Sequence, residues 1–172
     1  FNREILEAGI AIDESRILRI AKEVNLPKAS KILNLKGCLV LPGLIDCHVH
    51  LREQQLAYKE DFFSGTSAAA AGGVTLVLDM PNNKPVTMDI QSLRKRMKLA
   101  EKKAIVNIAF YSAFPKDSKE IPAIVKEGAI AFKVFLSQKI GGVDIDDDNA
   151  LLQAFKTAKE NGVPVAVHAE DR

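Results

Sequence analysis

From Leu41 onward the sequence repeats one pattern, in which a short apolar run is followed by a segment with helical periodicity. The apolar runs are rich in Val, Ile and Leu, which is typical of strands buried on both faces of a parallel sheet. The predicted strands are 44–50, 74–80, 105–113, 129–137 and 163–168, and the predicted helices are 61–72, 89–103, 118–127 and 148–161. This alternation predicts an α/β fold in which helices cross over between parallel strands.

Two architectures contain such repeats, the doubly wound open sheet and the (β/α)8 TIM-type barrel. Histidines at the ends of the first and fifth predicted strands favour the barrel, because residues from several barrel strands converge on one face. A whole barrel needs about 250 residues, so this chain would supply about five of the eight β/α units. An open barrel would also leave two edge strands unpaired. We therefore expect a partial barrel that belongs to a longer protein.

The first 40 residues follow a different pattern. Three β-like runs, ILEAGIAID, RILRIAKEV and SKILNLKGCLVL, are separated by short polar breaks. They predict a few antiparallel strands of a small β unit that is too small to fold alone. We expect a domain boundary between residues 40 and 41.

Composition excludes several classes of function. The chain is 47% hydrophobic with a net charge of +2, which gives no electrostatic basis for binding nucleic acid or an anionic membrane. No apolar run approaches the roughly 18 residues of a membrane span, and the polar start FNREILEAG is not a signal peptide. Cys38 and Cys47 lie in apolar sequence, which favours buried, reduced thiols in a cytoplasmic protein over a disulfide.

The three histidines of the chain, His48, His50 and His168, all lie where a metal site would need them. Residues two apart on a strand point to one face, so His48 and His50 present two neighbouring imidazoles. Alone, an H-x-H pair is equally well explained by ordinary strand histidines. Asp46, on the same face, is a candidate carboxylate for orienting an imidazole. With His168 at an equivalent strand end, the pattern predicts a zinc site.

Three further polar residues are candidates for the same site. Lys133 lies in the apolar run AIAFKVFLS, where burial lowers the pKa of an amine, although a lysine that reaches the surface is the simpler reading of this pattern alone. Arg52 would share the face of His50 if the strand continues, and its guanidinium can hold a carboxylate bidentately. Asn82 follows the second strand and is either a turn former or a donor to that carboxylate. The basic cluster KRMKLAEKK at 95–103 is interpreted as a solvated helix face.

Taken together, these motifs resemble a known family. The segments LPGLIDCHVHLRE, KEDFFSGTSAAAAGGVTLVLDMPNNKP, AFKVFLS and VAVHAED, in this order, resemble the cyclic amidohydrolases of the urease-like superfamily. The resemblance covers almost the whole chain, and residues 41–85 are its most specific part. The arginine of HVHLR and the asparagine of MPN look like the dihydroorotase family rather than the hydantoinases.

The resemblance implies roles for individual residues. His48 and His50 would bind one Zn²⁺, His168 would bind a second, and a carbamylated Lys133 would bridge the two. Arg52 and Asn82 would hold the carboxylate of dihydroorotate or carbamoyl aspartate. A further metal-binding histidine and a catalytic aspartate would come from strands beyond residue 172. Residues 1–40 would be part of a small β-sandwich domain, and residues 41–172 the N-terminal portion of the barrel.

The implied activity is the interconversion of N-carbamoyl-L-aspartate and L-dihydroorotate in pyrimidine biosynthesis. The implied partner is this small-molecule substrate, with a homo-oligomer or association with other pyrimidine-pathway enzymes as two further expectations. The sequence departs from the family's HLREP and MPNT, reading HLREQQ and MPNN, which bears on substrate preference. A hydantoinase, dihydropyrimidinase or allantoinase is the alternative within the same chemistry. A catalytically inactive scaffold is a third hypothesis, disfavoured because four ligands are retained.

Overall fold

A computed structural model describes residues 4–170, in two compact units that divide at residues 41 and 42. In the first unit, β1 (Gly9–Asp13) pairs antiparallel with β2 (Arg16–Ala21), and η1 (Glu23–Asn25) follows. The two-residue connection places Glu14 and Ser15 at positive φ, as a tight hairpin of this length requires. The run at 30–41 forms no strand, so the expectation of a third β segment there is wrong.

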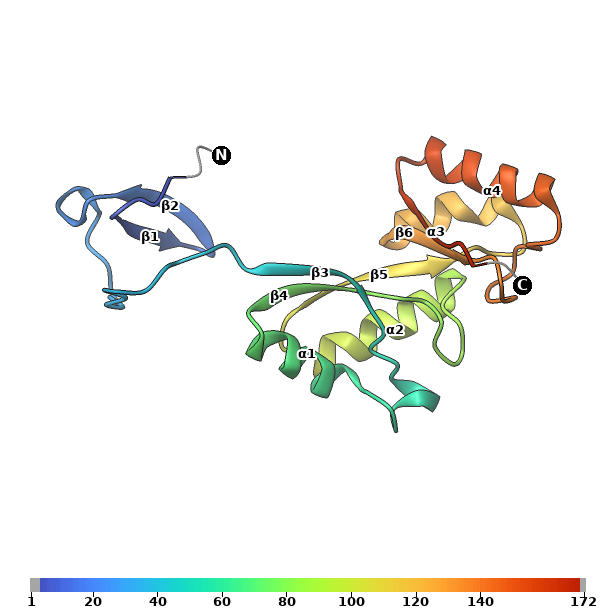
Figure 1. The fold of residues 1–172 in the computed structure, drawn as a ribbon, viewed down its shortest axis with the longest axis horizontal. Helices are drawn as coiled ribbons and strands as arrows, with labels where there is room; N and C mark the ends of the chain where they lie inside the picture. Colours follow the sequence, from blue (N-terminus) through green and yellow to red (C-terminus); the bar gives the residue numbers. More distant parts are fainter. Residues whose placement is uncertain (1–3, 171–172) are drawn as a thin grey trace. The chain divides into compact units, whose positions relative to one another are not determined.

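The second unit is an α/β layer with a five-stranded parallel sheet in the order β3-β4-β5-β6-β7 (Figure 1). The strands are β3 (Leu44–Val49), β4 (Val74–Asp79), β5 (Asn107–Ala113), β6 (Ala129–Phe135) and β7 (Val165–His168). The helices are η2 (Gln54–Leu56), α1 (Phe62–Ala71), α2 (Ile90–Lys103), η3 (Ser118–Glu120), α3 (Ile121–Glu127) and α4 (Asp148–Glu160). Each predicted strand and helix of this unit is present, with ends shifted by up to three residues.

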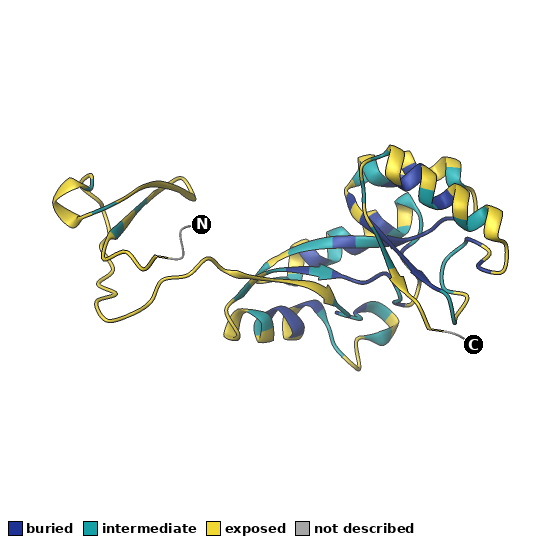
Figure 2. Cartoon of the chain, turned by 45° about the horizontal axis from the view of Figure 1, so that its top comes forward, coloured by how far each residue is buried: buried dark blue, intermediate teal, exposed yellow. Residues whose placement is uncertain are grey.

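The strand order decides between the two predicted architectures. A doubly wound sheet reverses its strand order at a switch point, whereas a barrel wall adds each new strand to the same edge. Here every strand pairs with the one before it in sequence and no reversal occurs. The partial barrel expected from the sequence is confirmed. Its two edges are β3 and β7, and Figure 2 shows β3 exposed along most of its length.

The hydrophobic core lies between the sheet and its helices. Phe62, Leu93 and Phe132 are fully buried, and the rings of Phe114 and Phe132 stack with centroids 4.8 Å apart. The cysteines do not share in this core: Cys38 and Cys47 are free thiols on exposed positions, so the prediction that both are buried is wrong. Cys47 is exposed because it lies on the edge strand β3. No helix within residues 4–170 has the length and apolarity to cross a membrane.

Helix starts are specified locally, and α1 packs against the segment that follows the histidine pair. Asp61 and Asp89 cap α1 and α2, and each forms a reciprocal capping box with a serine three residues later. Inside α1, a Cβ atom on Gly65 would overlap the side chain of Leu51. Glycine at this position therefore lets α1 pack directly against the residue that follows His50.

Candidate metal and substrate site

The end of β3 places the first two candidate ligands side by side. The rings of His48 and His50 have centroids 5.2 Å apart, with their planes inclined at 55°. Nδ1 of His50 donates to Oδ1 of Asn82 at 2.7 Å. An amide oxygen only accepts hydrogen bonds, so Nδ1 carries the proton and Nε2 keeps a free lone pair. The His50 ring is therefore held in the tautomer in which Nε2 is available to a metal.

Lys133 is buried on β6, where only 2% of it is exposed. Its backbone neighbours are Ala113 on β5 and Ala166 on β7, and its Nζ lies 4.8 Å from the ring centroid of Phe135. Burial lowers the pKa of the Lys133 amine. The surface-reaching lysine considered from the sequence is therefore wrong, and the side chain has the environment that favours a neutral, nucleophilic amine.

His168 lies on β7, two residues beyond Ala166, the residue paired with Lys133. The register of β6 and β7 pairs Phe135 with His168, and their rings are 5.6 Å apart. Phe135 thus contacts both Lys133 and His168. In this structure Nε2 of His168 lies 2.7 Å from Oε2 of Glu170, so the imidazole is engaged by a neighbouring carboxylate. Asp171, the last residue of the VAVHAED motif, lies outside the described residues.

The electrostatics of the histidine pair favour neutral imidazoles, the form that binds metals. Burial is the largest cause that lowers the pKa of His48; the charges of Lys133 and His168 lower it further, and Asp46 opposes them. Burial also lowers the pKa of His50, against the hydrogen bond to Asn82. Oδ1 of Asp46 accepts from the backbone N–H of His48 at 3.0 Å, so its hydrogen bond is to the strand backbone.

These residues fit a metal centre in part. Two adjacent neutral imidazoles suit Zn²⁺, and a carbamate on Lys133 would add oxygen ligands. Within residues 4–170, no three His, Cys, Asp or Glu side chains converge closely enough to hold an ion. The candidate set therefore depends on modification of Lys133 and on a turn of His168 away from Glu170.

Arg52 and Asn82 come together by a route that the sequence did not predict. The strand ends at Val49, and the φ of 51° at Arg52 turns the chain sharply, so the condition under which Arg52 would share the face of His50 is not met. Nη1 of Arg52 nevertheless donates to the carbonyl oxygen of Asn82 at 3.4 Å. The side-chain oxygen of Asn82 faces His50, so Asn82 links the candidate carboxylate-binding arginine to the candidate metal ligand.

Sequence reasoning missed a buried ion pair between Arg96 and Asp79, which lies behind the loop that carries Arg52. Nε of Arg96 donates to Oδ2 of Asp79 at 2.6 Å, and both side chains are 1% exposed. Burial raises the pKa of Asp79, while Arg96 and the backbone N–H of Leu51 act in the opposite direction. Arg96 belongs to the basic cluster interpreted as solvated, and for this residue the interpretation is wrong. Its spacing of three residues from Leu93 was the signal, since it places Arg96 on the buried helical face.

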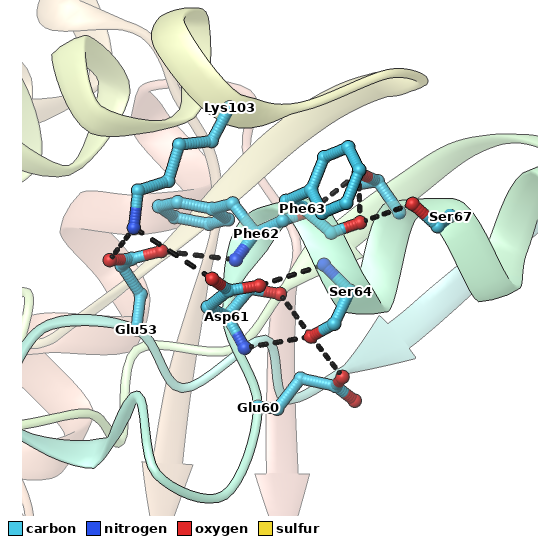
Figure 3. Close-up of polar contacts among 9 residues, drawn as sticks. Glu53, Glu60, Asp61, Phe62, Phe63, Ser64, Ser67 and Lys103 are labelled. Carbon is cyan, nitrogen blue, oxygen red and sulfur yellow. Dashed lines mark hydrogen bonds and ion pairs between the residues drawn. The ribbon is translucent and has the colours of Figure 1, made fainter.

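A second contact ties the loop to the start of α1 (Figure 3). Oε1 of Glu53 accepts from Nζ of Lys103 at 2.7 Å, and Oε2 accepts from the backbone N–H of Phe62 at 3.0 Å. Burial alone would raise the pKa of Glu53, but these two hydrogen bonds, a third from the backbone N–H of Gln54 and the charge of Lys103 together lower the pKa. Lys103 also lies 3.9 Å from Asp61, and the pKa of the Lys103 amine is raised chiefly by its hydrogen bond to Glu53.

The lowered pKa of Glu53 predicts an acid-dependent stability. A carboxyl whose pKa is depressed by folding stabilises the protein above its unfolded pKa, about 4.3, and this contribution is lost as the pH falls through the folded value. We expect Glu53→Gln to destabilise the protein by a constant amount between about pH 6 and 8. The difference should shrink below about pH 4. Urea unfolding midpoints of the wild type and of Glu53→Gln, measured across this pH range, test this prediction. A stability difference between the two proteins that stays the same size at the acid end would contradict the prediction.

Comparison with known proteins places the chain in a family. Residues 39–172, most of the chain, match the amidohydrolase family. The chain belongs to this family. It is 33% identical over 172 residues to the dihydroorotase of Methanosarcina acetivorans, covering 99% of this chain and 37% of that protein. It is 36% identical over 167 residues to the dihydroorotase of Methanothermobacter thermautotrophicus, covering 97% of this chain and 37% of that protein. The amidohydrolase chain thus spans little more than a third of these relatives.

Solved structures of amidohydrolases share the fold. The L-hydantoinase (dihydropyrimidinase) of Arthrobacter aurescens superposes with a TM-score of 0.90 at 27% identity, covering 99% of this chain and 38% of that one. The dihydroorotase of Saccharomyces cerevisiae superposes with a TM-score of 0.61 at 23% identity, covering 74% of this chain and 36% of that one, which shows the fold alone. These two comparisons establish the partial barrel but leave the substrate to be argued from the site.

Proposed function

We propose that the complete protein containing this chain is a zinc-dependent cyclic amidohydrolase, a dihydroorotase that interconverts N-carbamoyl-L-aspartate and L-dihydroorotate. The observation that carries the proposal is the contact between Arg52 and Asn82 directly beside His50. A guanidinium next to a metal-ligand candidate suits a substrate that has a carboxylate close to its reacting amide. The sequence relatives named dihydroorotase support this assignment.

In this proposal, His48, His50, His168 and a carbamylated Lys133 hold two divalent cations. Bound metal would supply a water of lowered pKa and would polarise the ring carbonyl. Carbamylation requires the neutral amine of Lys133 to add to carbon dioxide, with release of one proton. The burial that lowers the pKa of Lys133 supports this step. The second imidazole nitrogen of His50 stays bound to Asn82, which fixes the ring for its role.

A hydantoinase is the second candidate, favoured by the close backbone superposition on the Arthrobacter aurescens enzyme. Hydantoin and dihydropyrimidines lack the carboxylate of dihydroorotate. An arginine at position 52 would have no anionic partner on such substrates, and its desolvation would be uncompensated. The chemistry of Arg52 therefore favours the carboxylate-bearing substrate.

The substrate proposal predicts a selective effect of Arg52→Met in the complete protein. With the wild type, dihydroorotate should be hydrolysed far faster than hydantoin or allantoin. Loss of the bidentate ion pair should lower kcat/KM for dihydroorotate by roughly 100-fold, equivalent to about 2.7 kcal/mol. Steady-state kinetics on the three substrates measures this. Arg94→Met is the matched control, since Arg94 pairs with Glu127 on the exposed face of α2.

Either of two results would contradict the substrate proposal. Hydantoin or allantoin turnover above that of dihydroorotate would assign the hydantoinase or allantoinase alternative. Unchanged kcat/KM in Arg52→Met would remove the arginine from substrate binding. Absence of bound metal together with absence of all three activities would instead support the scaffold hypothesis.

The remaining features of the proposal concern the complete protein. Residues 1–40 would form part of a small β-sandwich domain, and residues 41–172 the first part of the barrel. The enzyme would act in the cytoplasm in pyrimidine biosynthesis, as a homo-oligomer or together with other enzymes of that pathway.

A further inference from the structure

We propose that Arg96 is a positioning residue that sets substrate affinity by holding the backbone of Arg52. This role rests on the proposed function, in which Arg52 binds the substrate carboxylate. Arg96 lies on α2, and its shortest contact with the loop is to the backbone carbonyl of Arg52, so we expect it to act on the substrate through Arg52.

The loop that carries Arg52 has an unfavourable backbone conformation. Arg52, Glu53 and Gln54 have φ angles of 51°, 57° and 53°, so three consecutive residues with side chains have positive φ. Non-glycine residues rarely do so even singly, because Cβ approaches the following carbonyl oxygen. Such a turn persists only where surrounding contacts determine it. The direction of the Arg52 side chain therefore depends on those contacts.

Arg96 supplies the contact at the start of the turn. Its Nη1 donates to the carbonyl oxygen of Arg52 at 2.8 Å and lies 3.4 Å from Oε1 of Gln54. Its Nε is fixed by Asp79, whose other oxygen accepts from the backbone N–H of Leu51 at 3.0 Å. The Asp79–Arg96 pair thus holds the chain on both sides of the peptide that joins Leu51 to Arg52.

The geometry of Arg96 is itself rigid. Its guanidinium carbon lies 4.6 Å from the ring centroid of Phe62, which is fully buried at the start of α1. One nitrogen binds the carboxylate of β4 while another binds the loop, so one rigid planar group fixes the spacing between the two acceptors. A lysine at this position would keep the charge pair with Asp79, but its single nitrogen would not hold the Arg52 carbonyl at the same fixed spacing.

Other contacts hold Glu53, whereas the backbone carbonyl of Arg52 is held by Arg96. The backbone N–H of Glu53 donates to the carbonyl oxygen of Glu60 at 3.0 Å, and the Glu53 side chain binds Lys103 and Phe62. Lys103 is seven residues beyond Arg96, so both cations lie on one face of α2. Loss of Arg96 would therefore loosen Arg52 while Glu53 stays anchored.

The test compares Arg96→Lys with Arg94→Lys in the complete protein. A small displacement of a substrate-positioning group costs up to about 100-fold, so we expect Arg96→Lys to raise KM for dihydroorotate by roughly 10- to 100-fold. The value of kcat should change by less than about threefold, because the chemical groups are untouched. Hydrolysis of dihydrouracil, which lacks the carboxylate, should be unchanged. Arg94→Lys on the exposed face of the same helix should match the wild type.

A double variant separates positioning from a general structural role. If Arg96 acts through Arg52, Arg96→Lys should have no further effect on KM in an Arg52→Met background. Equal losses on both substrates, or full additivity with Arg52→Met, would overturn the inference. A wild type that does not turn over dihydroorotate would refute the proposed function, and with it a substrate role for Arg96.

If Arg96→Lys folds poorly, a second variant and a second measurement still test the inference. Asp79→Asn combined with Arg96→Gln removes both buried charges together and should raise KM for dihydroorotate similarly. Hydrogen exchange reports the anchoring without any substrate: peptides covering 51–54 should exchange faster in either variant, whereas peptides from the 61–71 helix should not. Unchanged exchange and an unchanged KM would overturn the inference even if dihydroorotase activity is present.

Discussion

Lys133→Ala in the complete protein should abolish most of the activity and most of the bound metal. In the proposed site the carbamate on Lys133 would be the protein ligand common to both cations, so its loss would remove that ligand and the anion that offsets their charge. We expect kcat to fall by roughly 1000-fold or more, equivalent to about 4 kcal/mol at the transition state. Kinetics on dihydroorotate and metal analysis of the same preparation measure the two effects together.

Lys139→Ala is the matched control for this variant. Lys139 lies on the surface, where it pairs with Asp146 at 2.6 Å, and its removal should leave both activity and metal content unchanged. Full activity with a normal zinc content in Lys133→Ala would show that the lysine is not a bridging ligand. The burial of Lys133 would then be explained by packing against Phe135 alone.

Among the substitutions proposed for this protein, Asp79→Ala should lower the free energy of unfolding most. Arg96 would be left buried and charged with no carboxylate beside it, and removal of one partner of a buried pair typically costs about 3–5 kcal/mol. The backbone N–H of Leu51 would lose its acceptor as well. Urea unfolding of the complete protein measures the change in the free energy of unfolding.

The exposed pair between Arg94 and Glu127 provides the comparison. Two hydrogen bonds of 2.6 and 2.7 Å join these side chains, so the contact geometry is as good as that of the buried pair. Glu127→Ala should nevertheless change stability little, because water solvates the remaining charge. If Asp79→Ala and Glu127→Ala lowered the free energy of unfolding equally, burial would not explain the stabilisation at Asp79.

The barrel architecture could be predicted because it depends on local signals. The strand that carries Lys133 is otherwise apolar, and α1 and α2 are each preceded by an aspartate with a serine three residues on. These features are properties of adjacent residues, so one sequence is sufficient to recognise them. The candidate histidines also followed from strand-end positions, which the alternation of strands and helices fixes, whereas the role of Lys133 came from the family resemblance.

The contacts that shape the site could not be predicted in the same way. The bond between His50 and Asn82 joins residues 32 apart, and that between Arg96 and the Arg52 carbonyl joins residues 44 apart. Such pairings depend on how α2 packs behind the loop. The positive-φ turn at 52–54 was also unforeseen, because no glycine marks it and distant side chains hold it. Sequence thus indicated the candidate site residues, and packing determined how they are held.

The most direct test of the metal centre is a crystal structure of the complete protein measured at the zinc absorption edge. The proposal predicts two anomalous peaks on either side of a carbamylated Lys133, one within bonding distance of His48 and His50 and the other of His168. It also predicts that the His168 ring has turned away from Glu170. An active enzyme with an unmodified Lys133 and no anomalous density beside these residues would contradict the account.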